Sequence, residues 1–148
     1  VSPVMIDAKN PLYSVNGVFN AIFIHGNVLG DAMFYGSGAG KLPTASAVVA
    51  DVVDCAKNKG RNIMMSWSEE KLNLLQIDDV KSRFFVRVSG HAAERQSEIE
   101  ELFGKVEIVA VPSLSEEFAF ITGEITEQEY REKAEKLDGI QSRIRARI

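Results

Sequence analysis

The feature that most constrains the fold is a glycine-dense stretch at residues 35–44, which reads Tyr-Gly-Ser-Gly-Ala-Gly-Lys-Leu-Pro-Thr. Glycines at alternate positions remove Cβ atoms where a backbone turns sharply or approaches another group closely. Pro43 suits a first helical turn, and the apolar periodicity that follows predicts a helix over residues 43–58, ended by Gly60. The stretch therefore predicts a turn into a helix, whose uncovered N–H groups would attract anions or electron-rich groups.

The residues before this stretch predict a β-hairpin. Two β-rich runs, at residues 18–25 and 28–35, are separated by Gly26-Asn27, a dipeptide that favours the positive φ angles of a tight turn. Both faces of the hairpin are apolar, so we expect cover on two sides. The helix over residues 43–58 carries so little charge that it also needs a partner. Residues 1–15 predict a short strand followed by a turn.

A change in composition predicts the domain organisation. Residues 1–58 hold seven charged side chains, whereas residues 59–148 hold 31. We predict a first part at residues 1–58, a connector at 59–82 and a second domain at 83–148. The second domain is expected to be an α+β, split-βαβ ferredoxin-like sandwich of βαββαβ order, with two helices on one face of an antiparallel sheet. The predicted elements are strands at 84–88, 106–111, 117–123 and 140–148, and helices at 92–103 and, opened by a Thr126/Glu129 capping box, at 126–138.

Charge and cysteine content exclude several function classes. A net charge of −4 argues against a nucleic-acid partner or an anionic membrane surface, because neither would be attracted. A single cysteine excludes an internal disulfide, two histidines supply no zinc cluster, and a cytoplasmic location is expected. No apolar run approaches the roughly 20 residues that span a bilayer. The start at Val1, without a methionine, suggests a piece of a longer protein.

The glycine-dense stretch fits neither of two familiar phosphate-binding motifs. A P-loop requires glycine and Ser/Thr where this chain has Tyr35 and Leu42. A dinucleotide fingerprint requires its third glycine one place later than Gly40. A ligand-contact loop and a tight structural turn both stay open.

Other residues capable of chemistry have plainer interpretations. Lys41 is expected to be solvated, and His25, with no acidic partner at an obvious spacing, to be a surface residue. His91 is expected to be a loop residue, and Cys55 to be packed and inert on its helix. In the last strand, arginines alternate with apolar residues, which predicts that the arginines line a solvent face, while contact with an effector carboxylate or with another subunit stays open. These arginines are Arg143, Arg145 and Arg147.

Residues 1–58 resemble the end of the catalytic domain of homoserine dehydrogenase. The resemblance is carried by Asn20-Ala21, the glycines of the dense stretch, and the string Gly-Ala-Gly-Lys-Leu-Pro-Thr-Ala-Ser-Ala-Val at residues 38–48. It implies an NAD(P)-dependent oxidoreductase that interconverts L-homoserine and L-aspartate 4-semialdehyde, on the route to threonine, methionine and isoleucine. It also implies that the backbone of Gly40, with Gly38 and Ala39 beside it, approaches the nicotinamide end of NADP or NAD.

The resemblance also implies what this chain lacks. The Rossmann domain, the acidic substrate-binding residues and the catalytic lysine of the family precede the matching segment. We therefore expect no catalytic residue in this chain, no binding of the cofactor by the chain alone, and no dehydrogenase activity without the missing segments.

The second domain is similar to the ACT domain of many bacterial homoserine dehydrogenases. Effector-binding ACT domains carry Asp-x-x-Gly after the first strand, where this chain has Ser-Gly-His-Ala-Ala at residues 89–93. This departure favours dimerisation over binding of an effector amino acid such as threonine, and a homo-oligomer is expected. The alternative to an enzyme fragment is a non-catalytic amino-acid-sensing or subunit-pairing ACT-like protein.

Overall fold

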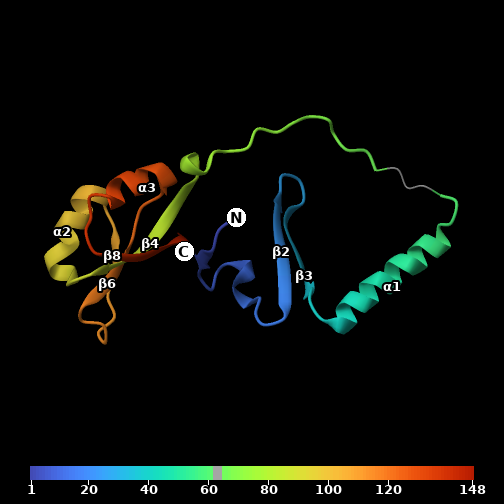
Figure 1. Cartoon of the computed structure of the whole chain (residues 1–148), viewed down its shortest axis with the longest axis horizontal. Coiled ribbons are helices and arrows are strands. Elements are labelled where there is room, and N and C mark those ends of the chain that lie inside the picture. The colour runs from blue at the N-terminus through green and yellow to red at the C-terminus, as the bar shows by residue number, and fades with distance from the viewer. Residues whose placement is uncertain (62–64) are drawn as a thin grey trace. The chain divides into compact units, whose positions relative to one another are not determined.

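The computed structural model describes residues 1–61 and 65–148 (Figure 1). The chain forms two compact units, one of Ala8–Lys71 and one that joins Val1–Asp7 to Leu72–Ile148. Each unit combines helices with strands, as expected for an α+β chain. The N-terminal seven residues thus belong to the same unit as the C-terminal half of the chain, which the composition did not predict.

The unit of Ala8–Lys71 contains the predicted hairpin and helix. Its elements are η1 (Pro11–Ser14), β2 (Phe19–Gly26), β3 (Gly30–Ser37) and α1 (Lys41–Lys57). The predicted hairpin turn at Gly26-Asn27 was wrong. Gly26 instead pairs with Gly30, which leaves a three-residue turn, and the positive φ of +76° falls on Gly30. Three-residue hairpin turns commonly place their left-handed residue after the loop, where glycine is strongly favoured.

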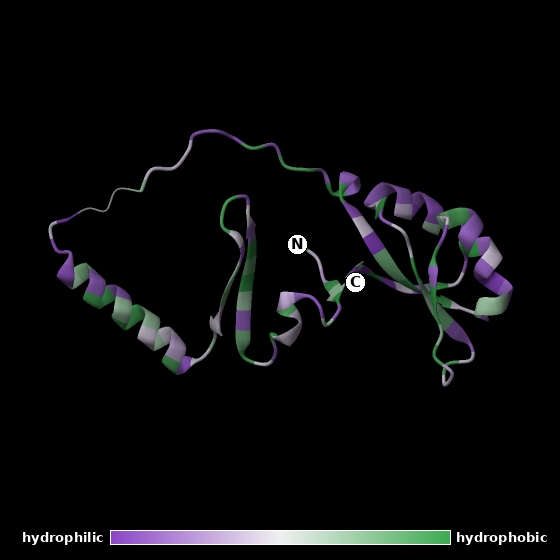
Figure 2. Ribbon diagram, turned by 180° about the vertical axis from the view of Figure 1, so that it is seen from behind, coloured by the Kyte–Doolittle hydropathy of each residue, from purple (hydrophilic) through white to green (hydrophobic). Residues whose placement is uncertain are grey.

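Both faces of the hairpin carry apolar residues, and hydrophobic positions along its strands are green in Figure 2. On one face the rings of Phe19 and Tyr35 stack with centroids 5.0 Å apart. On the other face Ile22 and Phe34 lie opposite each other, and each is 65% exposed. Within the described residues of this unit, the expected cover on two sides is not supplied.

Helix α1 likewise has no buried residue. Its exposed residues include Cys55, which we expected to be packed. The prediction rested on the apolar character of the helix, which indicates a need for a partner but does not provide one. Hydrophobic residues along α1 are visible in Figure 2.

The second unit is a mixed sheet covered by helices on one face (Figure 1). Its elements are β1 (Val4–Ile6), η2 (Ile77–Asp79), β4 (Lys81–Ser89), α2 (Ala92–Phe103), β5 (Glu107–Val109), β6 (Glu117–Ile121), β7 (Ile125–Thr126), α3 (Glu127–Ala134) and β8 (Ile140–Arg147). The strand order is β1-β8-β4-β6-β5, and β7 pairs with β4. Strand β1 runs parallel to β8, whereas the other pairs are antiparallel.

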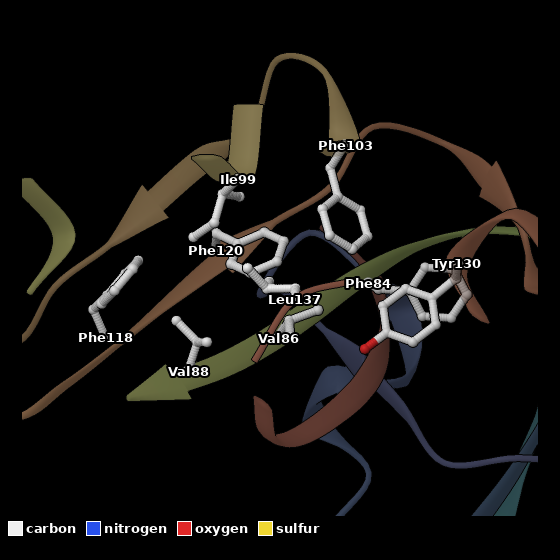
Figure 3. Close-up of a cluster of buried hydrophobic side chains, with 9 residues drawn as sticks. All are labelled: Phe84, Val86, Val88, Ile99, Phe103, Phe118, Phe120, Tyr130 and Leu137. Carbon is white, nitrogen blue, oxygen red and sulfur yellow. The ribbon is translucent and has the colours of Figure 1, made fainter. Parts of the chain in front are cut away.

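The core of this unit lies between the sheet and its two helices (Figure 3). Strand β4 contributes alternate residues, because successive strand side chains point to opposite faces. Helix α2 has the predicted bounds. The predicted capping box of α3 is also confirmed, since Thr126 Oγ1 accepts from Glu129 N at 3.1 Å and Glu129 Oε2 accepts from Thr126 N at 2.8 Å. The buried cluster comprises Phe84, Val86, Val88, Ile99, Phe103, Phe118, Phe120, Tyr130 and Leu137.

The solvent-face interpretation of the β8 arginines was wrong for Arg145, whose side chain is 16% exposed, whereas Arg143 and Arg147 are exposed. Arg143 and Arg145 lie opposite Val86 and Phe84, two core residues of β4, and so they share the helix-covered face of the sheet. Both guanidinium groups pair with the buried carboxylate of Glu127, the first residue of α3. Alternation along a strand separates two faces but does not say which face is covered. Here a carboxylate from the preceding helix pairs with both arginines on that face.

Candidate functional site

Three small residues connect the hairpin to the helix. Strand β3 ends at Ser37 and α1 begins at Lys41, so Gly38, Ala39 and Gly40 form the link, which we call the glycine turn. Gly40 has a φ of +124°, a backbone conformation that favours glycine. A Cβ placed on Gly40 would also lie 3.4 Å from Pro43 Cδ. The turn therefore requires glycine at its last position because of its backbone conformation.

The start of α1 presents uncovered backbone donors. The first helical hydrogen bond runs from Thr44 N to Gly40 O at 3.1 Å, so the N–H groups of Lys41 and Leu42 have no acceptor within the helix. Gly40 supplies no side chain to cap them, and the first turn contains no acidic residue. This end of the helix therefore carries an uncompensated partial positive charge. Lys41 itself is exposed, as expected for a solvated lysine.

Asn20 packs against the glycine turn. It lies opposite Gly36 in the hairpin ladder, and a Cβ built on Gly38 would fall 2.7 Å from Asn20 Nδ2. A Cβ on Gly36 would meet nothing within 4 Å. The sequence points to Asn20 only through the family resemblance. Its contact with Gly38 depends on the register of β2 against β3, which could have been derived from the hairpin once its turn length was known.

His25 has an acidic partner that spacing along the chain did not reveal. Its Nδ1 atom lies 2.5 Å from Asp31 Oδ1, and both side chains are largely exposed. The two residues are a cross-strand pair, six positions apart in sequence but directly opposite in the hairpin. His25 is a surface residue, as predicted, and the pair offers no nucleophile.

A second region of interest follows β4. Gly90 has a φ of +102°, and His91 is the N-cap residue of α2 without a side-chain capping bond. Together with the loop between β5 and β6, they line a hollow of about 340 Å³. Glu117 on the rim of this hollow is held by Arg87, whose Nη2 atom lies 2.7 and 2.9 Å from the two carboxylate oxygens. His91 thus lies in a loop, as expected.

Neither a metal-binding cluster nor a membrane-spanning helix is found among the residues that the structure describes. No group of three or more His, Cys, Asp or Glu side chains there could hold a metal ion. None of the described helices combines the length and the apolar character needed to cross a membrane.

The glycine turn suits binding rather than proton transfer. It offers a backbone without large side chains, a glycine at positive φ and two uncovered N–H donors. These features fit one wall of a pocket for an electron-rich or anionic group, such as a dinucleotide cofactor. They do not form a complete pocket.

Comparisons with known proteins show that the glycine turn lies in a segment shared with one enzyme family. A sequence model of the homoserine dehydrogenase family matches residues 1–53, which include the hairpin and the glycine turn. The homoserine dehydrogenase of Lactococcus lactis is 42% identical over 91 residues, which are 60% of this chain and 21% of that protein. The homoserine dehydrogenase of Corynebacterium glutamicum is 54% identical over 59 residues, which are 40% of this chain and 13% of that protein. The chain spans about a fifth of the Lactococcus lactis protein.

Solved structures extend the similarity in fold to the whole chain. The homoserine dehydrogenase of Thiobacillus denitrificans has a TM-score of 0.75 at 24% identity and covers 99% of this chain and 38% of that one. A Staphylococcus aureus homoserine dehydrogenase has a TM-score of 0.69 at 24% identity, covering 99% of this chain and 37% of that one. Sequence similarity to homoserine dehydrogenases covers the segment that contains the glycine turn, and similarity in fold extends to the rest of the chain. Residues 1–53 thus match the homoserine dehydrogenase family in sequence, and the chain as a whole is similar in fold to part of solved homoserine dehydrogenases.

Proposed function

We propose that this chain is the C-terminal part of a homoserine dehydrogenase, an enzyme that interconverts L-homoserine and L-aspartate 4-semialdehyde with NADP or NAD. The observation that carries the proposal is the position of the glycine turn. It lies within the segment matched by the family, and its geometry permits close approach to the backbone. In such an enzyme the nicotinamide supplies the hydride acceptor or donor when it is bound.

The contribution of this chain is one wall of the cofactor pocket. Gly40, with Gly38 and Ala39 beside it, leaves backbone exposed where a side chain would keep a ligand at a distance. The uncovered N–H groups at the start of α1 favour an electron-rich group at the same place. The glycine turn would therefore bind and orient the cofactor through its exposed backbone. Close contact between the turn and the cofactor would leave no room for other groups there.

The isolated chain is inactive in this account. Hydride transfer requires a fixed nicotinamide and a positioned proton-transfer group, and both belong to segments that precede the matched part in the family. The glycine turn alone offers too little surface to hold a dinucleotide. The cytoplasmic location expected from the single cysteine stays a prediction.

The second unit acts as an ACT-like pairing module in the parent enzyme. Support comes from the strand order β8-β4-β6-β5, with both helices packed on one face, which is the arrangement of a ferredoxin-like sandwich. We expect this module to join subunits of a homo-oligomer. A pairing role needs no effector, in keeping with the Ser-Gly-His-Ala-Ala sequence at residues 89–93.

The hollow beside His91 favours a second candidate, an amino-acid-sensing protein without catalysis. Its volume of about 340 Å³ would admit a small amino acid. Isothermal titration with threonine, valine and isoleucine distinguishes the two roles. We expect no heat of binding up to millimolar concentrations, and binding of any of the three would favour sensing.

A fusion protein tests the proposed function. The part of the Lactococcus lactis relative that precedes its matched segment is joined to this chain, and reduction of NADP and NAD is measured with homoserine. We expect activity from the fusion and none from the chain alone. If the fusion folds but is inactive, while the intact Lactococcus lactis protein is active in the same assay, the proposal fails.

A further inference from the structure

We infer that Asn20 is a positioning residue that sets the place of the glycine turn, and thereby the affinity of the site for a nicotinamide cofactor. This inference rests on the proposed function of the turn. It gives a role to Asn20 of strand β2, which lies beside the glycines of the site.

The register of the hairpin places Asn20 beside two glycines. Asn20 pairs with Gly36, and Gly38 follows two residues later, just beyond the end of β3. Because side chains of alternate residues point to the same face, the two glycines leave that face without Cβ atoms beside Asn20. The amide occupies part of this space, since a Cβ on Gly38 would approach its Nδ2 and Cγ atoms to 2.7 and 3.3 Å. Asn20 therefore limits how closely the turn can approach the strand.

Asn20 is a polar residue among apolar neighbours. Its neighbours on this face of the hairpin, Ile22 and Phe34, are apolar and exposed. Within the described residues, its only side-chain hydrogen bond is a long one, from Nδ2 to Val18 O at 3.5 Å, and Oδ1 has no partner. An apolar side chain would serve packing alone equally well. The amide is thus free to contact polar backbone groups of the turn or of a ligand held there.

The two glycines give the inference a matched pair of variants. Gly36→Ala adds a methyl group into open space, whereas Gly38→Ala adds one against the Asn20 amide. Neither glycine has a positive φ, so backbone strain does not separate the two variants. The two variants therefore differ in whether the added methyl group meets the Asn20 side chain.

The first measurement needs no activity. Backbone amide resonances of Gly38, Ala39 and Gly40 are followed by NMR in the 148-residue chain for Asn20→Ala. The control is Ile22→Ala, an exposed position two residues along the same face of the same strand. We expect Asn20→Ala to shift the resonances of the turn and Ile22→Ala to leave them in place. Equal effects of the two variants, or none, would overturn the inference.

The second measurement is rescue. In the fusion with the Lactococcus lactis segment, Gly38→Ala is expected to raise the KM for the cofactor roughly tenfold or more, because small misplacements of binding groups are costly. Gly36→Ala should leave this KM unchanged. Adding Asn20→Ala to Gly38→Ala should recover much of the loss, because the shorter side chain makes room for the new methyl group.

The outcomes separate the two proposals. An inactive fusion with Asn20 intact contradicts the proposed function, whereas the NMR measurement still tests the position of the turn. An active fusion in which Gly36→Ala and Gly38→Ala are equally harmful, or in which Asn20→Ala gives no recovery, overturns the role of Asn20 alone.

Discussion

Arg145 donates from Nη2 to Glu127 Oε2 across 2.5 Å, a bond that ties the last strand of the sheet to the first residue of α3. The Glu127 side chain is only 5% exposed, and its second oxygen pairs with Arg143. The Arg143 guanidinium in turn lies 4.7 Å from the centre of the Tyr130 ring. One carboxylate thus allows two arginines to occupy the covered face of the sheet.

Removal of the Glu127 charge should destabilise the second unit. Glu127→Gln leaves the largely covered guanidinium of Arg145 and the partly exposed guanidinium of Arg143 without a counter-ion, and breaking a buried pair costs about 3–5 kcal/mol. Urea unfolding followed by circular dichroism measures the loss. The control is Glu117→Gln, whose carboxylate pairs with Arg87 at a more exposed place and should cost no more than about 1 kcal/mol. Equal losses would contradict the importance of the buried cluster.

The same carboxylate makes stability depend on pH. Burial raises the pKa of Glu127, but hydrogen bonds and charge attraction from Arg143 and Arg145 outweigh it, so the pKa lies below its ordinary value of 4.5. The unfolded chain therefore takes up the proton first as the pH falls. The stabilisation is complete above pH 4.5 and is lost as the pH falls through the lower pKa of the folded state. Urea midpoints should fall more steeply below pH 4.5 for the unaltered chain than for Glu127→Gln, and parallel curves would contradict this.

Gly139 should tolerate no side chain. It has a φ of +77°, and a Cβ there would lie 2.3 Å from Ser89 Oγ and 3.2 Å from Arg95 Nη1. Backbone strain alone costs about 1–3 kcal/mol for a residue other than glycine, and the overlap adds to it. Gly123→Ala is the matched control, because a Cβ there meets nothing within 4 Å and its φ is not positive. Thermal unfolding should show a clear loss for Gly139→Ala only, and similar melting temperatures would contradict the geometry.

The isolated chain should self-associate through the unit of Ala8–Lys71. Apolar residues lie exposed on both faces of the hairpin and along α1. Exposed apolar surfaces of this extent favour association. Sedimentation at several concentrations should show a mass that rises with concentration, and Ile22→Lys should reduce it. A monomer at all concentrations would show that these surfaces do not associate.

Local patterns predicted the elements well. The spacing of Thr126 and Glu129 gave the capping box, and the apolar period with Gly104 gave the bounds of α2. Both depend on residues within a few positions of one another, where hydrogen bonding and side-chain periodicity act directly.

Relations across the chain were not predicted. The parallel pairing of Val4 with Arg145 joins segments about 140 residues apart, and a three-residue strand has too short a pattern to indicate its neighbour. The covering of Arg145 depends on Glu127, which lies on another element. In the candidate site, the alternate glycines predicted a turn before the helix, whereas the positive φ of Gly40 and the contact of Asn20 with Gly38 required the structure.

The most direct test of the account measures cofactor affinity when the glycine turn is blocked. In the fusion with the Lactococcus lactis segment, Gly40→Val places a branched side chain at a φ of +124° beside Pro43. The control, Gly104→Val, changes a glycine of φ +76° that ends α2 and has open space around it. Fluorescence titration with NADPH gives the Kd of each variant. We predict that Gly40→Val weakens binding at least about tenfold, whereas Gly104→Val leaves the Kd unchanged. A folded Gly40→Val fusion with unaltered affinity would contradict the assignment of the turn to the cofactor pocket.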